Sequence, residues 1–328
     1  MLKLPSRSLG EIYTDLAIEA HERAGMQGFS HIPGVDVDEY STDNCHVSRV
    51  SISSREGSKI LGKVPGNYVT LDVADLKQRD RTMEEEIATI FAKELKALLR
   101  LADDDEVLVV GLGNWQATPD ALGPRVISNL LVTRHMRQYV PEDIRGGLRG
   151  LAAIAPGVLG ITGIETSEII QGVVEKTRPA AVICIDALAA RDTQRLLRTI
   201  QIADTGIHPG SGVGNKRLGI TSETLGVPVI AVGVPTVVHA ATIAYDTINY
   251  LIEELQQQSR FYEILDELDL MDRQRLYNEV LQPKIGSLVV TPKEIDVYIN
   301  EISRVIAGAL NTALHHEVTY EDHFKYLM

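Results

Sequence analysis

From Glu106 onward the chain alternates short apolar runs with segments of helical periodicity, and this alternation constrains the fold more than any other feature. Buried parallel strands have this composition, because helices cover both faces of their sheet. We therefore predict an α/β fold with a mainly parallel central sheet and helices on both faces. The predicted strands are VLVV at 107–110, LAAIA at 151–155, AVICI at 181–185, VPVIAV at 227–232 and SLVV at 287–290.

A smaller β-rich part precedes this region. The segments HVSRVSIS at 46–53 and NYVTLDVA at 67–74 are rich in β-branched residues, and a stretch with three glycines and a proline separates them. This composition predicts paired strands. We expect a small N-terminal β layer, followed by a helix at 82–100.

Helical periodicity marks several connections. One helix is expected after Pro124, with Ile127, Leu130, Leu131 and Arg134 on one stripe, and another should bury Ile169, Ile170, Val173 and Val174. The chain contains no internal repeat or low-complexity linker, which favours a single domain over residues 16–328. Residues 256–281 are charged and helical in character, and could form an insertion.

The composition is that of a soluble globular protein. Hydrophobic residues make up 44% and charged residues 23% of the chain, and no apolar window reaches the ~18 residues of a membrane span. The first residues lack the pattern of a signal peptide, and with only two cysteines, Cys45 and Cys184, a disulfide framework is excluded. A net charge of −13 opposes attraction to nucleic acid. We expect a cytoplasmic protein that binds neither membranes nor nucleic acid directly.

Three polar segments fall where the predicted strands end, which is where α/β sheets bind ligands. The first runs from Gly111 through Gly113 and Asn114 to Asp120. The second is Asp186, directly after AVICI and before the helix-forming stretch ALAARDTQRLLRTIQ. The third is the loop 205–217, which contains four glycines and His208.

The glycines of the first and third segments leave a nucleotide- or small-molecule-binding protein open as an alternative, because glycine permits close backbone approach to phosphate. The spacing argues against it. Gly111 and Gly113 lack the third glycine of G-x-G-x-x-G, and no G-x-x-x-x-G-K-[ST] occurs.

Asp120 and Asp186 could perform general acid–base catalysis. If the two carboxyl groups share a proton, one activates a water while the other hydrogen-bonds the scissile carbonyl, and the pair titrates as a unit. Each could instead cap the helix that follows it, which contributes about 1 kcal/mol. The pattern alone favours capping for either residue.

The remaining polar candidates have simpler explanations. A lone loop histidine such as His208 or His239 is more often structural than catalytic, and His315-His316 lacks the spacing of a helical zinc pair. Ser211 lies between glycines but not in a strand–G-x-S-x-G–helix context. We expect no metal and no cofactor.

Several long strings taken together are similar to the spore germination protease family: GLGNWQATPDALGP, TRHM, AIAPGVLGITGIETSEII, IDALAAR, QIADTGIHPGSGVGNKR and VPVIAVGVPTVV. The resemblance runs from about Thr14 to the C-terminal region. It implies a fold like that of the hydrogenase maturation proteases. It also implies that Asp120 and Asp186, in TPDALGP and IDALAAR, are the catalytic pair of an endopeptidase that uses neither an acyl-enzyme nor a metal.

The resemblance further implies substrates, processing and assembly. The substrates would be the small acid-soluble proteins that coat spore DNA, degraded in the forespore and spore core compartment at germination. The chain would be made as a zymogen that cleaves itself between Asp15 and Leu16, in the stretch TDLAIE, so that residues 1–15 are a propeptide. A homotetramer is expected. Which aspartate is the base stays open at this point, as do the role of 256–281 and that of the His208 loop.

Overall fold

The computed structural model describes residues 14–26, 28, 29, 31–73, 80–141, 147–207, 218–257, 277–316 and 318–326. The strands are β1 (Val35–Ser41), β2 (Cys45–Ile52), β3 (Gly66–Val73), β4 (Val107–Gly111), β5 (Leu151–Ile154), β6 (Ala181–Ala190), β7 (Thr199–Ala203), β8 (Val229–His239) and β9 (Val289–Val290). The longer helices are α1 (Ala17–Met26), α3 (Arg81–Leu98), α8 (Thr166–Thr177), α10 (Ala240–Gln257) and α14 (Ile295–Leu314).

Shorter helices connect these elements. The α-helical ones are α2 (Arg55–Leu61), α4 (Leu122–Ser128), α5 (Met136–Tyr139), α7 (Leu159–Thr162), α9 (Ser222–Leu225), α13 (Gln282–Ile285) and α15 (Tyr320–Tyr326). The 3-10 turns are η2 (Thr118–Asp120) and η3 (Thr193–Arg195), and η5 (Tyr277–Leu281) is π-helical.

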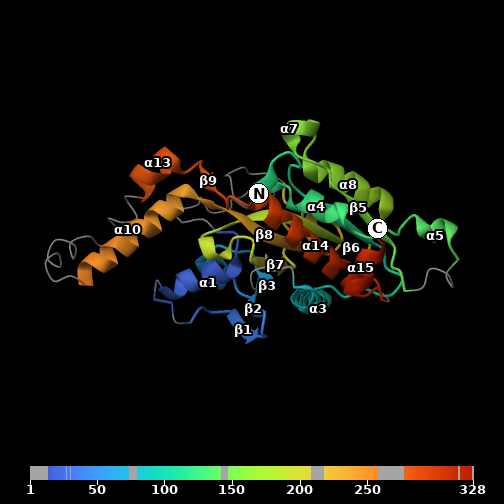
Figure 1. Cartoon of the computed structure of the whole chain (residues 1–328), viewed down its shortest axis with the longest axis horizontal. Coiled ribbons are helices and arrows are strands. Elements are labelled where there is room, and N and C mark those ends of the chain that lie inside the picture. Colours follow the sequence, from blue (N-terminus) through green and yellow to red (C-terminus); the bar gives the residue numbers. More distant parts are fainter. Residues whose placement is uncertain are drawn as a thin grey trace.

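The described strands form one mixed sheet in the order β1-β2-β3-β7-β8-β6-β4-β5, with β9 paired to β8 (Figure 1). Strands β5, β4, β6 and β8 are parallel, while β7, β3, β2 and β1 continue the sheet with antiparallel pairs. The predicted α/β class is confirmed. The predicted N-terminal strands also form, and they join the main sheet through the β3–β7 pair.

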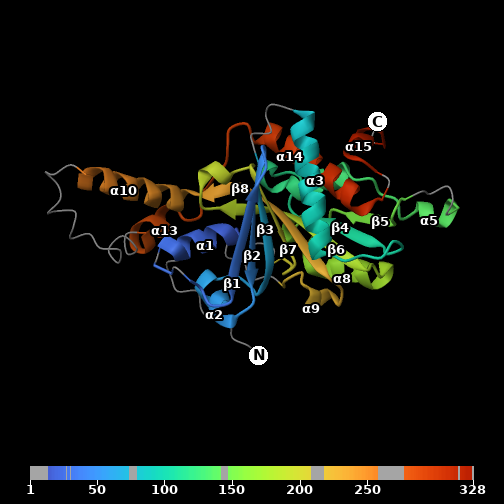
Figure 2. The ribbon, with the colours of Figure 1, turned by 90° about the horizontal axis from the view of Figure 1, so that it is seen from below.

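Alternate residues of the buried strands pack on opposite faces of the sheet, as the pleat requires. Ile183 and Ile185 of β6 face the cluster beneath α3, α4 and α14, whereas Val182 and Cys184 face α8. The α1 helix packs on the α8 face, nearer to β2 and β3. Figure 2 shows α3 and α14 on one side of the sheet and α1 and α8 on the other. The predicted covering of both faces is thereby confirmed.

The chain after Asp186 differs from the expectation. A helix is predicted there, but β6 continues to Ala190 and is followed by η3 and β7. The reason is tertiary pairing: Leu188, Ala189 and Ala190 are in register with β8, and the two alanines are buried. Pairing with a neighbouring strand overrides the helix propensity of Ala and Leu.

Two further segments also depart from the expected pattern. Helix α4 ends at Ser128, so Leu130, Leu131 and Arg134 lie beyond it rather than on its stripe. Helix α10 extends away from the sheet (Figure 1), and most of 256–281 lies outside the described residues. None of the described helices is both long and apolar enough to cross a membrane.

Candidate active site

The turn that carries Asp120 closes back on the end of β4. The main-chain N–H of Asn114 donates to the Asp120 carboxylate at 2.8 Å and to the Asp120 carbonyl oxygen at 3.0 Å. Gly113 has φ +111, and a Cβ there would lie 2.0 Å from the Asp120 carbonyl oxygen. Only glycine fits such a position. Gly113 therefore serves the packing of this turn.

Close packing also accounts for Gly111. A Cβ on Gly111 would lie 2.3 Å from the Gly123 carbonyl oxygen, so the end of β4 and the first turn of α4 are in backbone contact. Asp120 does not cap α4, whose N-cap is Ala121 without a side-chain hydrogen bond. Capping is thus the wrong reading for Asp120. Both glycines allow two stretches of main chain to pack closely. This packing accounts for them without a bound phosphate.

Asp186 lies within β6, six residues into a ten-residue strand, and not at the start of a helix. Capping is therefore the wrong reading for this residue too. Its side chain accepts a hydrogen bond from the Ala187 N–H at 2.9 Å. Its neighbour in register on β8 is Gly233, and the Leu188 side chain occupies the space over that glycine.

The turn that carries Asp120 contacts the strand that carries Asp186. The N–H of Leu112, one residue past β4, donates to the Ile185 carbonyl at 2.8 Å, and η2 contacts both β6 and β8. Burial raises the pKa of Asp186 well above its ordinary value, and the charge of Asp120 raises it further. Asn114, also predicted, lies in this site as a backbone donor.

The segment around Asp15 lies beside Asp186. Asp15 N–H donates to the Ala189 carbonyl at 2.9 Å, and Ala189 N–H donates to the Asp15 carboxylate at 2.8 Å. The Asp15 carboxylate also contributes to raising the pKa of Asp186, after burial and Asp120. Leu16 is fully buried in the cluster beneath α1. The Asp15–Leu16 peptide therefore lies along the strand that carries Asp186.

Glu19 anchors the other end of this segment. Its buried carboxylate accepts from the N–H groups of Arg191 at 2.8 Å and Asp192 at 3.0 Å, just after β6. The Thr14 hydroxyl also donates to it. Residues 14–19 are thus held against the C-terminal half of β6 at both ends.

Of the remaining candidates, the structure describes His239 and His315 but not His208 and Ser211. His239 ends β8, and His315 accepts from Arg149 N–H at 3.1 Å through Nδ1. Burial lowers the pKa of His315 to about 4, so this histidine is a neutral structural acceptor. Across the described residues, no cluster of His, Cys, Asp and Glu has the arrangement of a metal site.

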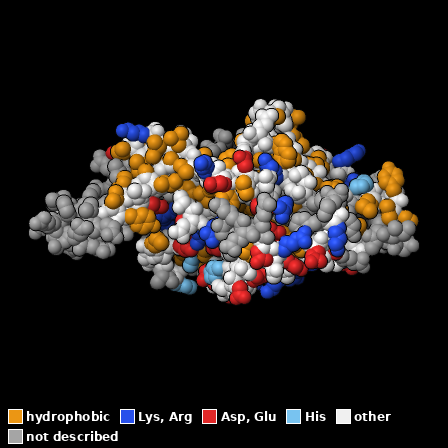
Figure 3. Space-filling view, viewed as in Figure 1, with side chains coloured by type: hydrophobic (Ala, Val, Ile, Leu, Met, Phe, Trp, Pro, Cys, Tyr) orange, Lys and Arg blue, Asp and Glu red, His pale blue; other side chains and the backbone are white. Residues whose placement is uncertain are grey.

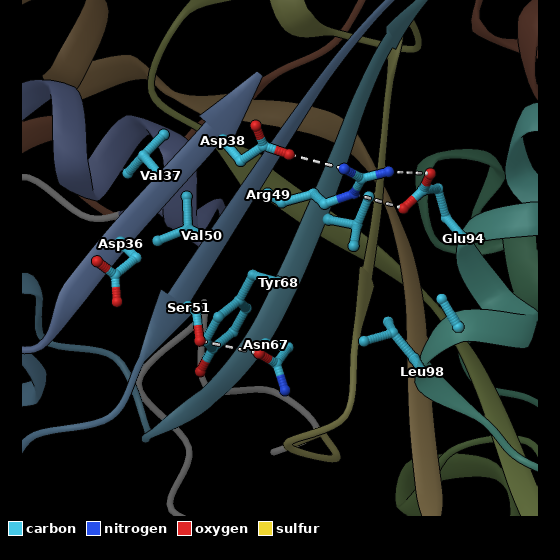
Figure 4. Close-up of a pocket in the computed structure, with 12 residues that line it drawn as sticks. Asp36, Val37, Asp38, Arg49, Val50, Ser51, Asn67, Tyr68, Glu94 and Leu98 are labelled. Atoms are coloured by element: carbon cyan, nitrogen blue, oxygen red, sulfur yellow. Dashed lines mark hydrogen bonds and ion pairs between the residues drawn. The ribbon is translucent and has the colours of Figure 1, made fainter. Parts of the chain in front are cut away.

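A groove of about 430 Å³ lies elsewhere, between the antiparallel strands and α3 (Figure 4). Arg49 spans it, donating to Asp38 at 2.7 Å and to both oxygens of Glu94 at 2.8 and 2.9 Å. Arg49 thus links the antiparallel strands to α3 through Asp38 and Glu94, and we call these three residues the Arg49 clamp. The groove lies apart from Asp120 and Asp186.

Comparison with known proteins gives one consistent family. The family model described as "Germination protease" matches residues 13–263 and 253–327. The germination protease of Caldanaerobacter subterraneus subsp. tengcongensis is 50% identical over 95% of this chain and 96% of its own length. That of Clostridium tetani is 47% identical over 96% and 99%, and that of a Geobacillus strain 42% over 97% and 98%.

Among solved structures, the [NiFe] hydrogenase maturation protease HycI of Thermococcus kodakarensis aligns with 66% of this chain and 99% of its own. The TM-score is 0.33 and the sequence identity 15%.

The family model and the germination protease relatives define a peptidase. The chain belongs to the germination protease family, as its sequence motifs predict, and acts in spore germination.

Proposed function

We propose that the chain is an endopeptidase in which Asp120 and Asp186 activate a water molecule for attack on a peptide bond. The observations that support the proposal are the effect of the Asp120 charge on the pKa of Asp186 and the pairing of Asp15 with Ala189 on the same strand. Coupled carboxyl groups can hold one proton between them, which supplies a base and an acid at the same pH.

The surroundings of each residue favour one assignment of roles. The N–H of Asn114 donates to the Asp120 carboxylate, and a hydrogen bond of this kind favours the ionised form. Burial and the charge of Asp120 favour the protonated form of Asp186. Asp120 is then the base that takes a proton from water, and Asp186 is the acid that donates one to the scissile peptide.

Self-cleavage between Asp15 and Leu16 fits this arrangement. Residues 1–15 would be a propeptide and residues 16–328 the single mature domain. The support is that Asp15 pairs with Ala189, three residues beyond Asp186 on the same strand. A single chain would therefore present its own acidic–apolar peptide to the carboxylate pair.

The protein substrates in this proposal are the small acid-soluble spore proteins, degraded in the cytoplasm of the forespore and spore core. The test uses one such purified protein, incubated with wild type, Asp120→Asn, Asp186→Asn and the control Asp103→Asn, all produced without residues 1–15. The Asp103 side chain is 90% exposed and lies outside the site. Either site variant should lose ~10²–10⁴-fold in rate. Cleavage by both at the wild-type rate would overturn the mechanism.

Fractionation of dormant spores tests the proposed location. Enzyme found outside the spore core would contradict it.

Self-association to a homotetramer is the remaining part of the proposal. Its support is an exposed apolar surface, visible in Figure 3 over α10, α13 and β9, that includes Tyr250, Leu288, Val289 and Val290. Contiguous apolar surface of this kind is typical of protein–protein contacts. Light scattering should give a tetramer for wild type and smaller species for Leu288→Lys; a monomeric wild type would contradict this part.

A further inference from the structure

The carbonyl oxygen of Asp15 is held by two side chains from distant parts of the chain. Lys63, between α2 and β3, donates to it from Nζ at 2.7 Å, and Gln201 of β7 donates from Nε2 at 3.3 Å. Gln201 is 8% exposed, so its amide is fixed within the protein. Lys63 Nζ also donates to the Thr14 carbonyl at 2.9 Å, which places its ammonium over this stretch of backbone.

The sheet register places Gln201 on the same face as Asp186. Gln201 is in register with Gly233, and Gly233 is in register with Asp186. Residues paired across strands point their side chains to the same face. Two strand spacings separate the backbones of Gln201 and Asp186 by about 10 Å. Gly233 lies between them, and the Leu188 side chain occupies the space over this glycine.

The rest of the Asp15–Leu16 peptide is held as well. Leu16 N–H donates to the Thr14 hydroxyl oxygen at 3.1 Å. The Gln201 side chain turns its Oε1 to Ala17 N–H at 2.7 Å, one residue further on. Gln201 thus bridges the two sides of this bond, which fixes the orientation of the peptide.

We propose that Lys63 and Gln201 are catalytic residues for self-cleavage, which bind the carbonyl oxygen of the Asp15–Leu16 bond and stabilise the negative charge that develops on it. This inference rests on the function proposed above and adds two residues to the aspartate pair. Donors already in place before the reaction need no reorganisation when charge appears. A cationic donor is stronger in this role than a neutral one.

The proposed hydrolysis balances in protons and in bonds formed and broken. The water oxygen bonds to the Asp15 carbonyl carbon while Asp120 takes a water proton, and the oxyanion forms between Lys63 and Gln201. The C–N bond then breaks, and the Leu16 nitrogen leaves as an amine with the proton from Asp186. The oxyanion collapses to the new carboxyl group of Asp15. Transfer of the proton from Asp120 to Asp186 restores the starting state.

The experiment follows the loss of residues 1–15 from the full chain by intact mass, after a shift from neutral to mildly acid pH. Lys63→Met keeps most of the side-chain length and removes the ammonium. Lys59→Met removes the same charge from the exposed face of α2 and is the matched control. We expect Lys63→Met to slow cleavage ~10²–10³-fold, the effect of removing one oxyanion donor, and Lys59→Met to leave the rate unchanged. Gln201→Glu, which keeps an acceptor for Ala17 N–H, should also slow cleavage.

Two further measurements separate charge stabilisation from anchoring. Hydrogen exchange at the Leu16 and Ala17 amides reports whether the segment is still seated in the variant. Lys63→Cys can be alkylated with 2-bromoethylamine, which restores an ammonium of similar reach, while Cys45 and Cys184 are buried. Unchanged amide protection with slow cleavage, and recovery of the rate after alkylation, are the expected results.

Three results would overturn the inference. The first is cleavage of Lys63→Met at the wild-type rate. The second is loss of amide protection together with cleavage in that variant. The third is a low rate of Lys63→Cys after alkylation. If the wild type itself keeps residues 1–15, the proposed function fails and this inference fails with it. Asp120→Asn distinguishes the cases further, because it should abolish cleavage while leaving the segment seated.

Discussion

The N–H of Leu112 donates a 2.8 Å hydrogen bond to the carbonyl of Ile185, which joins the loop carrying Asp120 to the residue that precedes Asp186. This bond continues the parallel pairing of β4 with β6, where Gly111 is in register with Ile185. The separation of the two aspartates is therefore set by sheet geometry. An error of about 1 Å in such a site can cost ~10²-fold in rate.

Gly113→Ala should damage the site locally. The residue has φ +111, and a Cβ would lie 2.0 Å from the Asp120 carbonyl oxygen and 3.1 Å from Oδ1. The strained backbone costs about 1–3 kcal/mol, and relief of the contact must move Asp120. We expect a lower unfolding midpoint and at least ~10²-fold slower self-cleavage. Gly160→Ala, where nothing lies within 4 Å, is the control. Wild-type cleavage by Gly113→Ala would contradict this account of the turn.

Asp186→Asn should stabilise the fold at neutral pH. Burial, and then Asp120, raise the pKa of Asp186 above its ordinary 3.8. Between the two values the folded chain binds more protons than the unfolded chain, so wild-type stability falls as pH rises through that window. Asparagine has no such dependence. Thermal unfolding should show the variant a few degrees more stable at neutral pH, with the difference vanishing below about pH 4.

The control for that measurement is Asp43→Asn, in the exposed turn between β1 and β2, which should follow the wild-type curve. Equal pH dependence in wild type and Asp186→Asn would mean that Asp186 does not hold a raised pKa in the folded chain.

Arg49→Met should destabilise the protein without affecting cleavage. The Glu94 side chain is 2% exposed and that of Arg49 is 37% exposed. Burial acts to raise the pKa of Glu94, but hydrogen bonds from Arg49 and Tyr40 outweigh it and leave this pKa below its ordinary value. Loss of Arg49 leaves a buried carboxylate less well paired, at a cost of about 1–3 kcal/mol. Chemical denaturation at neutral pH measures this loss.

The destabilisation caused by Arg49→Met should depend on pH, because the pKa of Glu94 is lowered in the folded chain. A lowered carboxyl pKa contributes stability above the unfolded value, and this contribution disappears as pH falls through the folded one. The deficit of Arg49→Met should therefore be largest near neutral pH and smaller in acid. In the background of Glu94→Gln the same substitution should cost less. A deficit that is independent of pH and of residue 94 would show that Arg49 acts through packing alone.

The sequence predicts much of the fold because buried strands have a local signature. Val182, Ile183 and Cys184 are apolar in an uninterrupted run, and β6 lies there. The same reasoning fails from Ala187 to Ala190, because alanine and leucine favour helix locally and only pairing with β8 makes this stretch a strand. Strand pairing between distant segments is not visible in the pattern of either one.

The candidate site was predictable to a similar extent. Asp120 and Asp186 can be chosen because motifs in their surroundings resemble a known family, whereas pattern alone favours capping for both. Lys63 lies in none of these motifs, and Gln201 begins the string QIADTGIHPGSGVGNKR without being marked there as a site residue. Each approaches Asp15 across a large sequence separation, 48 and 186 residues, and an isolated lysine or glutamine indicates no particular role.

The most direct test of the central claim is the intact mass of purified wild type, Asp120→Asn and Asp186→Asn after incubation at mildly acid pH. Burial raises the pKa of Asp186, so a pair sharing one proton should function in this range. The account predicts that only the wild type loses residues 1–15, with cleavage between Asp15 and Leu16. Equal loss of this segment from either aspartate variant would contradict it.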